Sequence, residues 1–429
     1  MPAYWMAAER SAASEAALRG QHCRVGVGRL PAHTLPVVVR VDGACDQAFS
    51  AVAEAFAANF ELGEIGAACT VDIDGEVVVD IWGGWADADR KRPWTRDTLV
   101  NAYSVGKPIV ALALLQQVAR GSVDLDEPAS RLWPELLAGQ HGATVRHVLC
   151  HRAGVPAIRE PLTNDALWDW PTMCRSIAAT DPWWEPGTRH AYHSNTYGHL
   201  VGELARRIDG RLPGTWLREE IASPLGADVA WGLDPSQQAR CADIEWEIDV
   251  TGGIDWLQSS AATDEQRMIA LGYTNPPGFS SIGVVNTREW RASQVPSTNL
   301  HATSRGVARI YSALAAGGSI DGITVLDGDR VFLTYSTTGR GNEPVNGSLG
   351  LLDMTPYGRR EAWEDNPEGW PEAPQADSPV GGHGSPICWY WRSDADGVAT
   401  WGPTSRPVPQ WTRPGATPAE TLGRQGHHH

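Results

Sequence analysis

The stretch NAYSVGKPIV, residues 101–110, contains a serine followed three positions later by a lysine. Pro108 is tolerated only near the start of a helix, so Ser104 and Lys107 are predicted to lie in the first turn of a helix over 108–121. Residues three apart share a helix face. Two interpretations follow: Ser104 is an N-cap beside a surface lysine, or the two residues are a nucleophile and its base.

The second interpretation has a physical basis. The unpaired N–H groups and the positive end of a helix start favour a developing oxyanion and lower the pKa of a nearby lysine. Only two of the 35 basic residues are lysines, Lys91 and Lys107. Arginine stays protonated, whereas a buried lysine can lose its proton and act as a base. The rarity of lysine therefore favours a chemical role for Lys107, although codon bias would also explain it.

Composition narrows the class of protein. The 429 residues are 42% apolar, which is typical of a globular protein, and the net charge of −16 argues against nucleic acid or an anionic membrane as partner. We expect no membrane span, because the chain has no apolar run of about 18 residues. We also expect no signal peptide, because residues 1–20 contain acidic side chains and no clear apolar core. The seven cysteines are scattered and match no metal-site spacing. These features predict a cytoplasmic protein without metal or organic cofactor.

Hydrophobic periodicity predicts an α+β fold. An amphipathic helix is expected over 49–65, and a β-hairpin over 66–84 with its turn at Asp74-Gly75. Further helices are expected at about 195–209 and 302–318. This order suggests an antiparallel β-sheet flanked by helices, with an inserted helical subdomain at roughly 125–300.

The ends of the chain differ from the middle. Residues 1–40 show weak periodicity and are interpreted as a loosely structured leader, with the main domain over 41–355. Residues 356–429 are rich in proline and tryptophan and are expected to be mostly loop, with one strand at 387–391. The three final histidines, 427–429, look like an expression tag.

A second segment with chemical potential is WWEPGTRHAYHSNTYGHLVGELARRIDG, residues 183–210. It combines a Pro-Gly turn, a short polar stretch and a helix, and it places Tyr192 just before that helix. A tyrosine there could present its hydroxyl to a cleft. The alternative is an aromatic residue that packs in the core with its O–H satisfied.

Four segments together resemble a known superfamily. NAYSVGK (101–107), VRHVLCHRAGV (145–155), residues 183–210 and PSTNLHATSRGVARIYSALAAGG (296–318) occur in the order found in the serine β-lactamases and penicillin-binding proteins. The sequence is most similar to the class C β-lactamase-like carboxylesterases, the family VIII esterases. The resemblance covers roughly residues 40–350 and implies a β-lactamase/transpeptidase-like fold.

The resemblance also implies roles for individual residues. Ser104 would be the acylated nucleophile, Lys107 the base or proton relay beside it, and Tyr192 the group that takes the serine proton and returns one to the leaving group. The oxyanion hole would combine the backbone N–H of Ser104 with one from a late edge strand over 381–391, near Gly384 or Ser385.

The sequence departs from the β-lactamase pattern at two motifs. Ser194 stands where the Tyr-x-Asn motif has its asparagine, and Asn195 follows one position later; both remain candidates for substrate binding. This difference favours an esterase over efficient β-lactam turnover. No lysine follows Lys107, so the Lys-Thr-Gly strand is absent, and His383-Gly384-Ser385 resembles the esterases' His-x-Gly strand. His383 is equally compatible with a loop.

Other sites receive less support from the sequence. There is no Gly-x-Ser-x-Gly, HExxH, P-loop or GxGxxG motif. His151 is interpreted as part of a structural turn. An aromatic cluster precedes Tyr192 and would form either plain core or the wall of an acyl pocket; its members are Trp168, Trp170, Trp183 and Trp184.

The sequence thus predicts a serine carboxylesterase that forms an acyl-enzyme on Ser104. Its substrates would be small-molecule esters of short to medium chain length, with weak β-lactam hydrolysis as a side activity. One alternative is another reaction at the same site: β-lactamase, D-amino peptidase, amidase or acyltransferase. The other is a binding protein that has lost catalysis through a degraded oxyanion strand.

Overall fold

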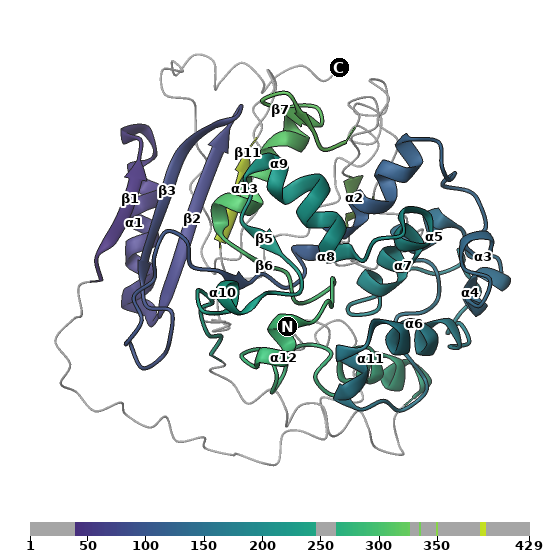
Figure 1. The fold of residues 1–429 in the computed structure, drawn as a ribbon. Helices are drawn as coiled ribbons and strands as arrows, with labels where there is room; N and C mark the ends of the chain where they lie inside the picture. The colour runs from purple at the N-terminus through teal and green to yellow at the C-terminus, as the bar shows by residue number, and fades with distance from the viewer. Residues whose placement is uncertain (1–38, 246–262, 327–333, 336–348, 351–386, 392–429) are drawn as a thin grey trace, which may run out of the picture.

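The computed structural model describes residues 39–245, 263–326, 334–335, 349–350 and 387–391. A four-stranded sheet lies at one side, helices α1 and α13 lie against it, and the remaining helices extend away from it (Figure 1). The fold is therefore of the α+β type that the sequence predicts. The predicted leader over 1–40 and the C-terminal segment over 356–429 lie almost entirely outside the described residues.

The predicted hairpin forms the centre of the sheet. Strands β2 (Gly66–Ile73) and β3 (Glu76–Gly84) are antiparallel, and β1 (Val41–Cys45) pairs with β3 at the edge. Asp74 and Gly75 both have positive φ, 53° and 89°. An Asp-Gly pair adopts this backbone readily, and the resulting turn matches the right-handed twist of the two strands.

The other edge of the sheet differs from expectation. A strand does form at β11 (Ile387–Trp391), but it runs parallel to β2, with Ile387 opposite Cys69, so the sheet is not wholly antiparallel. The alternation of side chains in a strand is the same when read in either direction. The strand pattern of this segment therefore could not predict which way it would run.

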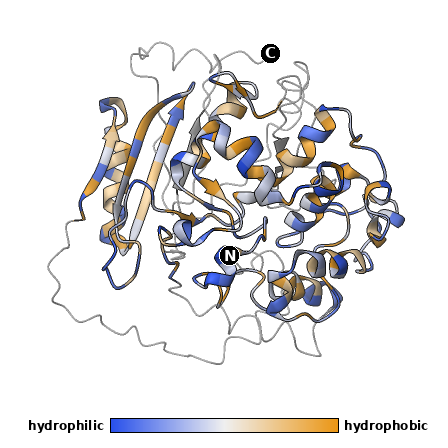
Figure 2. Ribbon diagram, in the orientation of Figure 1, coloured by the Kyte–Doolittle hydropathy of each residue, from blue (hydrophilic) through white to orange (hydrophobic). Residues whose placement is uncertain are grey.

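Strand β2 is buried on both faces. Ala67, Cys69 and Val71 lie in one apolar cluster with Phe56 of helix α1 (Ser50–Asn59). The alternate residues face helix α13 (Ser304–Ala315), whose hydroxyl groups bind polar side chains of the strand. The ribbons of β2 and α13 in Figure 2 accordingly carry both hydrophobic and hydrophilic residues. Thr70 Oγ1 lies 2.8 Å from Ser304 Oγ, so the interface is polar yet satisfied.

Helix α1 is shorter than the predicted helix over 49–65. After Asn59 the chain tightens into a 3₁₀ turn at Phe60–Leu62, and Gly63 ends it with φ of 104°. This is the left-handed conformation in which glycine commonly terminates a helix.

The main apolar core surrounds helix α2 (Gly106–Ala119), which is buried along nearly its whole length. Helix α7 (Tyr197–Asp209) packs beside it. Gly121 and Gly210 follow the two helices with φ of 73° and 88°, the left-handed conformation in which glycine commonly ends a helix. Ser104 lies just before α2, and Tyr192 lies in the segment just before α7.

Short elements complete the described chain. The other helices are α3 (Ala129–Leu132), α4 (Leu137–Gln140), α5 (Val145–Leu149), α6 (Trp170–Ala178), α8 (Pro213–Trp216), α9 (Ser223–Leu225), α10 (Pro235–Gln238), α11 (Asp264–Thr274) and α12 (Arg288–Ala292), with 3₁₀ turns at Gln47–Phe49 and Asn164–Trp168 and a π turn at Leu217–Ala222. A small sheet joins β4 (Val100–Asn101), β6 (His301–Ala302) and β5 (Val229–Ala230), and two-stranded ladders join β7 (Ser319–Ile320) to β8 (Ile323–Thr324) and β9 (Thr334–Tyr335) to β10 (Leu349–Gly350).

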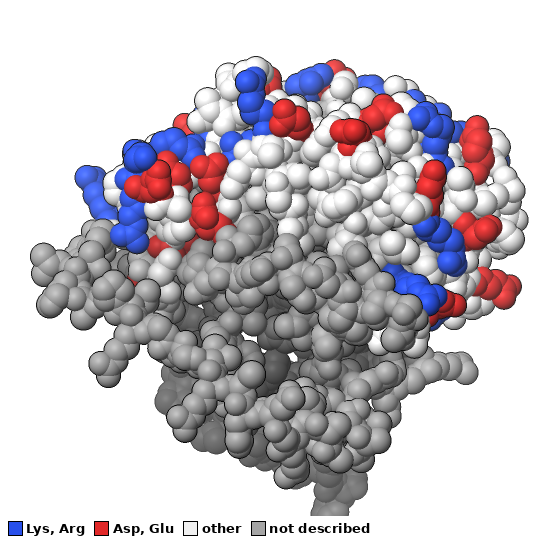
Figure 3. Space-filling view, turned by 90° about the horizontal axis from the view of Figure 1, so that it is seen from below, with Lys and Arg blue, Asp and Glu red and all other residues white. Residues whose placement is uncertain are grey.

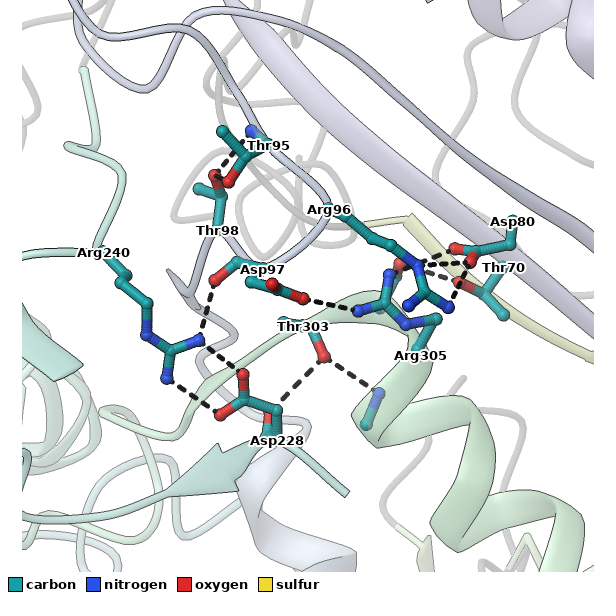
Figure 4. A network of polar contacts seen from close by, with 12 residues as sticks. Thr70, Asp80, Thr95, Arg96, Asp97, Thr98, Asp228, Arg240, Thr303 and Arg305 are labelled. Atoms are coloured by element: carbon teal, nitrogen blue, oxygen red, sulfur yellow. Dashed lines mark hydrogen bonds and ion pairs between the residues drawn. The ribbon is translucent and has the colours of Figure 1, made fainter. Parts of the chain in front are cut away.

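An ionic network fastens the large sheet to α13 (Figure 4). Asp80 of β3 receives Arg96 at 3.2 Å and Arg305 of α13 at 3.4 Å. Arg305 also reaches Asp97, at 3.0 Å. Because Asp80 is largely buried, these contacts hold the sheet and the helix in a fixed relation.

Surface charges are mixed. On the face shown in Figure 3, Lys and Arg side chains of the described residues lie among Asp and Glu side chains instead of gathering in one patch. Within the described ranges, no helix has the length and apolarity needed to cross a bilayer.

Candidate active site

Ser104 lies between strand β4 and helix α2. Asn101 anchors the strand, because its Nδ2 donates to the carbonyl of Thr298 at 3.0 Å and its Oδ1 accepts from Trp290 Nε1 at 3.1 Å. Tyr103, just before the serine, has φ of 49°, an unusual value for a residue other than glycine. Such strain tends to occur at functional sites, where the surrounding structure maintains it.

The hydroxyl of Ser104 does not cap helix α2, which has no side-chain cap. Its Oγ instead receives hydrogen bonds from Lys107 Nζ at 3.0 Å and from Tyr192 OH at 3.0 Å. The structure therefore brings together the three residues that the sequence singled out. The interpretation of Ser104 as an N-cap beside a surface lysine is wrong.

Lys107 lies beneath the serine with only 4% of its surface exposed. Its Nζ donates to the carbonyl of Ser297 at 3.0 Å and lies 4.8 Å from the centre of the Tyr192 ring. Burial alone lowers the pKa of Lys107 to about 7. A substantial fraction of the amine is consequently neutral near pH 7 and able to accept a proton.

Two glycines bring the Ser297 carbonyl to the lysine. A Cβ on Gly106 of α2 would lie 2.4 Å from the carbonyl oxygen of Pro296, and one on Gly198 of α7 would lie 2.4 Å from the nitrogen of Ser297. The Gly198 N–H also donates to Ser297 Oγ at 2.6 Å. Side chains at these positions would push the 296–297 segment away. The two glycines therefore allow α2 and α7 to lie close to the backbone of residues 296–297.

Tyr192 reaches the serine from the segment before α7. Its ring is partly buried, and burial raises the pKa of its phenol, while the hydrogen bond to Ser104 acts in the opposite direction. The phenol therefore remains protonated at neutral pH. It is placed to pass a proton between Ser104 and a leaving group above it.

The two polar residues after Tyr192 lie differently from expectation. Asn195 is fully buried, and its Nδ2 donates to the Gly272 carbonyl at 2.7 Å and to Ser280 Oγ at 2.8 Å. Its amide nitrogen thus secures the 272–280 segment, and a side chain with no exposed surface does not contact a substrate, which corrects its assignment to substrate binding. Ser194 is buried and hydrogen-bonded to the phenol of Tyr273.

The four tryptophans do not form one wall. Trp168 and Trp170 pack against the main core, and Trp170 Nε1 donates to Glu203 at 2.9 Å. Trp183 donates to the carbonyl of Ala157 at 2.8 Å. Trp184 approaches the Tyr192 segment, with its ring edge-on to that of His193 at 5.8 Å. The core interpretation therefore holds for Trp168 and Trp170.

The predicted oxyanion residues His383, Gly384 and Ser385 lie outside the described residues. Sequence reasoning missed Ser297, which contributes a main-chain carbonyl that no side-chain pattern marks. It also gave His151 no part beyond its turn, although the His151 ring lies 5.0 Å from that of Tyr192. In the described ranges, no cluster of His, Cys, Asp or Glu could hold a metal ion.

Comparison with known proteins identifies the family. The family model described as Beta-lactamase matches residues 49–385, a span that includes Ser104, Lys107 and Tyr192. The chain belongs to the beta-lactamase family. The predicted resemblance is confirmed.

Several proteins with esterase names are similar to this chain. It is 34% identical over 303 residues to an esterase/beta-lactamase, LipL, of Mycobacterium tuberculosis, which covers 68% of each chain. It is 37% identical over 180 residues to esterase EstB of Burkholderia gladioli, but this match covers 38% of this chain and only 45% of that relative. A solved family VIII carboxylesterase is 36% identical with a TM-score of 0.61, covering 68% of this chain and 76% of that one.

Proposed function

We propose that this member of the beta-lactamase family is a serine carboxylesterase that forms an acyl-enzyme on Ser104. The observation that carries the proposal is that Ser104 Oγ contacts both Lys107 Nζ and Tyr192 OH at 3.0 Å. A hydroxyl between a buried amine and a phenol has a direct route for losing its proton. The esterase names of the three similar proteins support ester cleavage as the reaction.

In the first step, Ser104 Oγ attacks the ester carbonyl while its proton passes to neutral Lys107, directly or through the Tyr192 phenol. The tetrahedral oxyanion then collapses, the bond to the alcohol breaks, and the relay returns the proton to the leaving alcohol. In the second step, water gives its proton to the same relay and attacks the acyl-enzyme. The acid is released and Ser104 regains its hydrogen.

The substrates we propose are small uncharged esters of short to medium chain length. The Lys107 amine donates to the Ser104 hydroxyl and to the Ser297 carbonyl, which are both uncharged groups. Ser194, at the position of the β-lactamase asparagine, is engaged with Tyr273 and offers no amide for β-lactam recognition. Weak β-lactam hydrolysis is therefore a side activity in this proposal.

The test is a chain-length series of p-nitrophenyl esters, acetate to palmitate, together with a chromogenic cephalosporin. We expect kcat/KM to be highest for the shorter esters and much lower for the cephalosporin. A serine-reactive phosphonate should label Ser104, as read by peptide mass spectrometry, and Ser104→Ala should lose both labelling and activity.

Two outcomes would contradict the proposal. Ester turnover by a folded Ser104→Ala variant would exclude Ser104 as nucleophile. Folded wild-type protein that neither reacts with the phosphonate nor turns over any ester would instead favour a binding protein on this fold.

A further inference from the structure

His151 holds the chain on both sides of Tyr192. Its carbonyl accepts from the N–H of Ala191 at 3.3 Å, and its Nδ1 accepts from the N–H of His193 at 3.0 Å. One residue thus binds the two immediate neighbours of the proposed proton-relay tyrosine. The His151 ring also lies 5.0 Å from the Tyr192 ring, so it contacts the side chain as well as the flanking backbone.

His151 is itself fixed from several directions. It is 2% exposed, and its ring stacks on that of Tyr197 at 4.4 Å. Its φ of 57° lies in the left-handed region, and its carbonyl and its ring nitrogen both bind the 191–193 segment. Few residue types other than glycine tolerate this conformation, but histidine and asparagine are among those enriched in it.

A second histidine extends the arrangement. His193 Nε2 accepts from the N–H of Val155 at 3.0 Å, and its Nδ1 lies 2.7 Å from the carbonyl of Ala191. An accepting nitrogen carries no hydrogen, so His193 has its hydrogen on Nδ1 and His151 has its hydrogen on Nε2. Both rings act in their neutral forms as acceptors for main-chain N–H groups.

We infer that His151 is a positioning residue for Tyr192, holding the phenol at hydrogen-bond distance from Ser104 by bracketing residues 191 and 193. This inference rests on the proposed function and concerns the relay of the same site. His151 touches neither the serine nor the reacting atoms in this arrangement. Its contribution is to keep the Tyr192 hydroxyl 3.0 Å from Ser104 Oγ, which the proton transfer needs.

The decisive atom is Nδ1 of His151, and a set of substitutions isolates it. His151→Asn places an amide oxygen close to the Nδ1 position and tolerates positive φ. His151→Phe keeps a ring of similar size on Tyr197 but has no acceptor. His151→Gly adopts positive φ freely and also has no acceptor, so it covers the case in which the phenylalanine variant does not fold.

A matched control lies in the same cluster. The His190 ring is 6.1 Å from that of His151 and is partly buried, and its Nδ1 has no hydrogen-bond partner. His190→Phe therefore removes a neighbouring histidine without removing an acceptor from the Tyr192 segment.

The experiment measures kcat and KM for p-nitrophenyl butyrate, the rate of Ser104 labelling by a phosphonate, and the thermal midpoint of each full-length variant. We expect His151→Phe and His151→Gly to lower kcat by about 10- to 100-fold, because a displacement of about 1 Å can cost that much, with KM within about threefold. Labelling should slow in parallel. His151→Asn should recover kcat to within about threefold of wild type, and His190→Phe should stay near wild type.

Rescue by asparagine separates positioning from proton transfer, since an amide cannot act as a base at these pH values. A folded His151→Gly or His151→Phe variant with wild-type kcat would overturn the inference. An asparagine variant as impaired as phenylalanine, at an unchanged thermal midpoint, would overturn it too. Both of these results would leave the proposed function unaffected. That function fails only if the wild-type protein shows no ester turnover or the Ser104→Ala variant shows it.

Discussion

Lys107 Nζ donates a hydrogen bond to the main-chain carbonyl of Ser297, 190 positions later in the chain, at 3.0 Å. The contact orients the amine toward Ser104 without providing a negative charge. A carboxylate in the same place would stabilise the ammonium form and raise the pKa, whereas a carbonyl leaves burial as the controlling influence. The pKa of Lys107 can therefore be lowered by burial because its acceptor at residue 297 is an uncharged carbonyl oxygen and not a carboxylate.

The first prediction concerns the identity of the base. Lys107→Arg should reduce kcat/KM for p-nitrophenyl butyrate by at least about 100-fold, because a guanidinium stays protonated and cannot accept the serine proton. The chain offers a matched control, Lys91→Arg, since the Lys91 side chain is 75% exposed and pairs with Asp89. Near-normal turnover by Lys107→Arg would contradict the assignment.

The pH dependence of catalysis should follow the lysine. Because the pKa of Lys107 is lowered to about 7, kcat/KM should fall about tenfold per pH unit below this value, as the amine becomes protonated. Burial raises the pKa of Tyr192, so no loss from phenol ionisation is expected below about pH 9. A stopped-flow profile from pH 5 to 9 with an uncharged ester checks this, and a maximum near pH 5 would refute it.

The lowered pKa of Lys107 should also make the free energy of unfolding depend on pH. Its pKa is about 7 in the folded protein against 10.5 for the unperturbed group, so between these values the unfolded chain binds a proton that the folded protein does not. The free energy of unfolding contributed by Lys107 must then rise with pH, by at most about 1.4 kcal/mol per unit. Relative to Lys107→Met, wild type should gain stability from pH 7.5 to 9.5 in urea titrations. Curves that stay parallel would show that the amine is not buried neutral.

Substitution of Gly106 should lower both stability and activity, because the backbone of residue 296 lies very close to it. Gly106→Ala would place a methyl group 2.4 Å from the Pro296 carbonyl oxygen, which has to move. We expect a loss of about 1–3 kcal/mol of stability and a larger loss of kcat than of substrate binding, because the Ser297 carbonyl moves with it. Gly272→Ala is the comparison, since its nearest neighbour is an oxygen at 3.2 Å. Equal effects of the two substitutions on kcat would argue against a specific role for the Gly106 contact.

The ionic network between sheet and helix should matter for stability more than for activity. Asp80→Asn weakens two charge-assisted contacts, to Arg96 and Arg305, and should cost about 1–3 kcal/mol in urea denaturation. The exposed pair of Asp89 with Lys91 provides a control, because Asp89→Asn should change stability by less than about 1 kcal/mol. Similar costs for both would mean that the partial burial of Asp80 is without energetic consequence.

Much of this structure follows from local sequence, and the limits have identifiable causes. The Asp74-Gly75 hairpin turn and the glycines that end α2 and α7 were predictable because each depends on a few adjacent residues. The early end of α1 was harder to place, since Phe60 continues the apolar face into a 3₁₀ turn. The parallel pairing of β11 depends on a chain path that no alternation pattern encodes.

In the candidate site, too, some features could be predicted from residue type and order, whereas others depend on the folded chain. Ser104, Lys107 and Tyr192 are side chains whose type and order could be matched to a family, and the structure places them in contact. Ser297 acts through its carbonyl and His151 through its ring nitrogen and its main chain, and neither role appears in residue type alone. Asn195 stands next to the motif position, yet its amide nitrogen donates to Gly272 and Ser280, contacts that the sequence motif does not encode.

The candidate site draws on three separate parts of the chain. Ser104 and Lys107 lie in one stretch, Tyr192 follows 88 positions after Ser104, and the Ser297 carbonyl lies 190 positions after Lys107. Reactivity of the serine therefore exists only in molecules in which all these segments have docked. The fraction of Ser104 that a phosphonate labels would therefore report the fraction of correctly folded molecules in a mixed preparation. If Ser104 is the nucleophile as proposed, its labelling measures the folded fraction, including in crude samples where spectroscopy reports an average over all molecules.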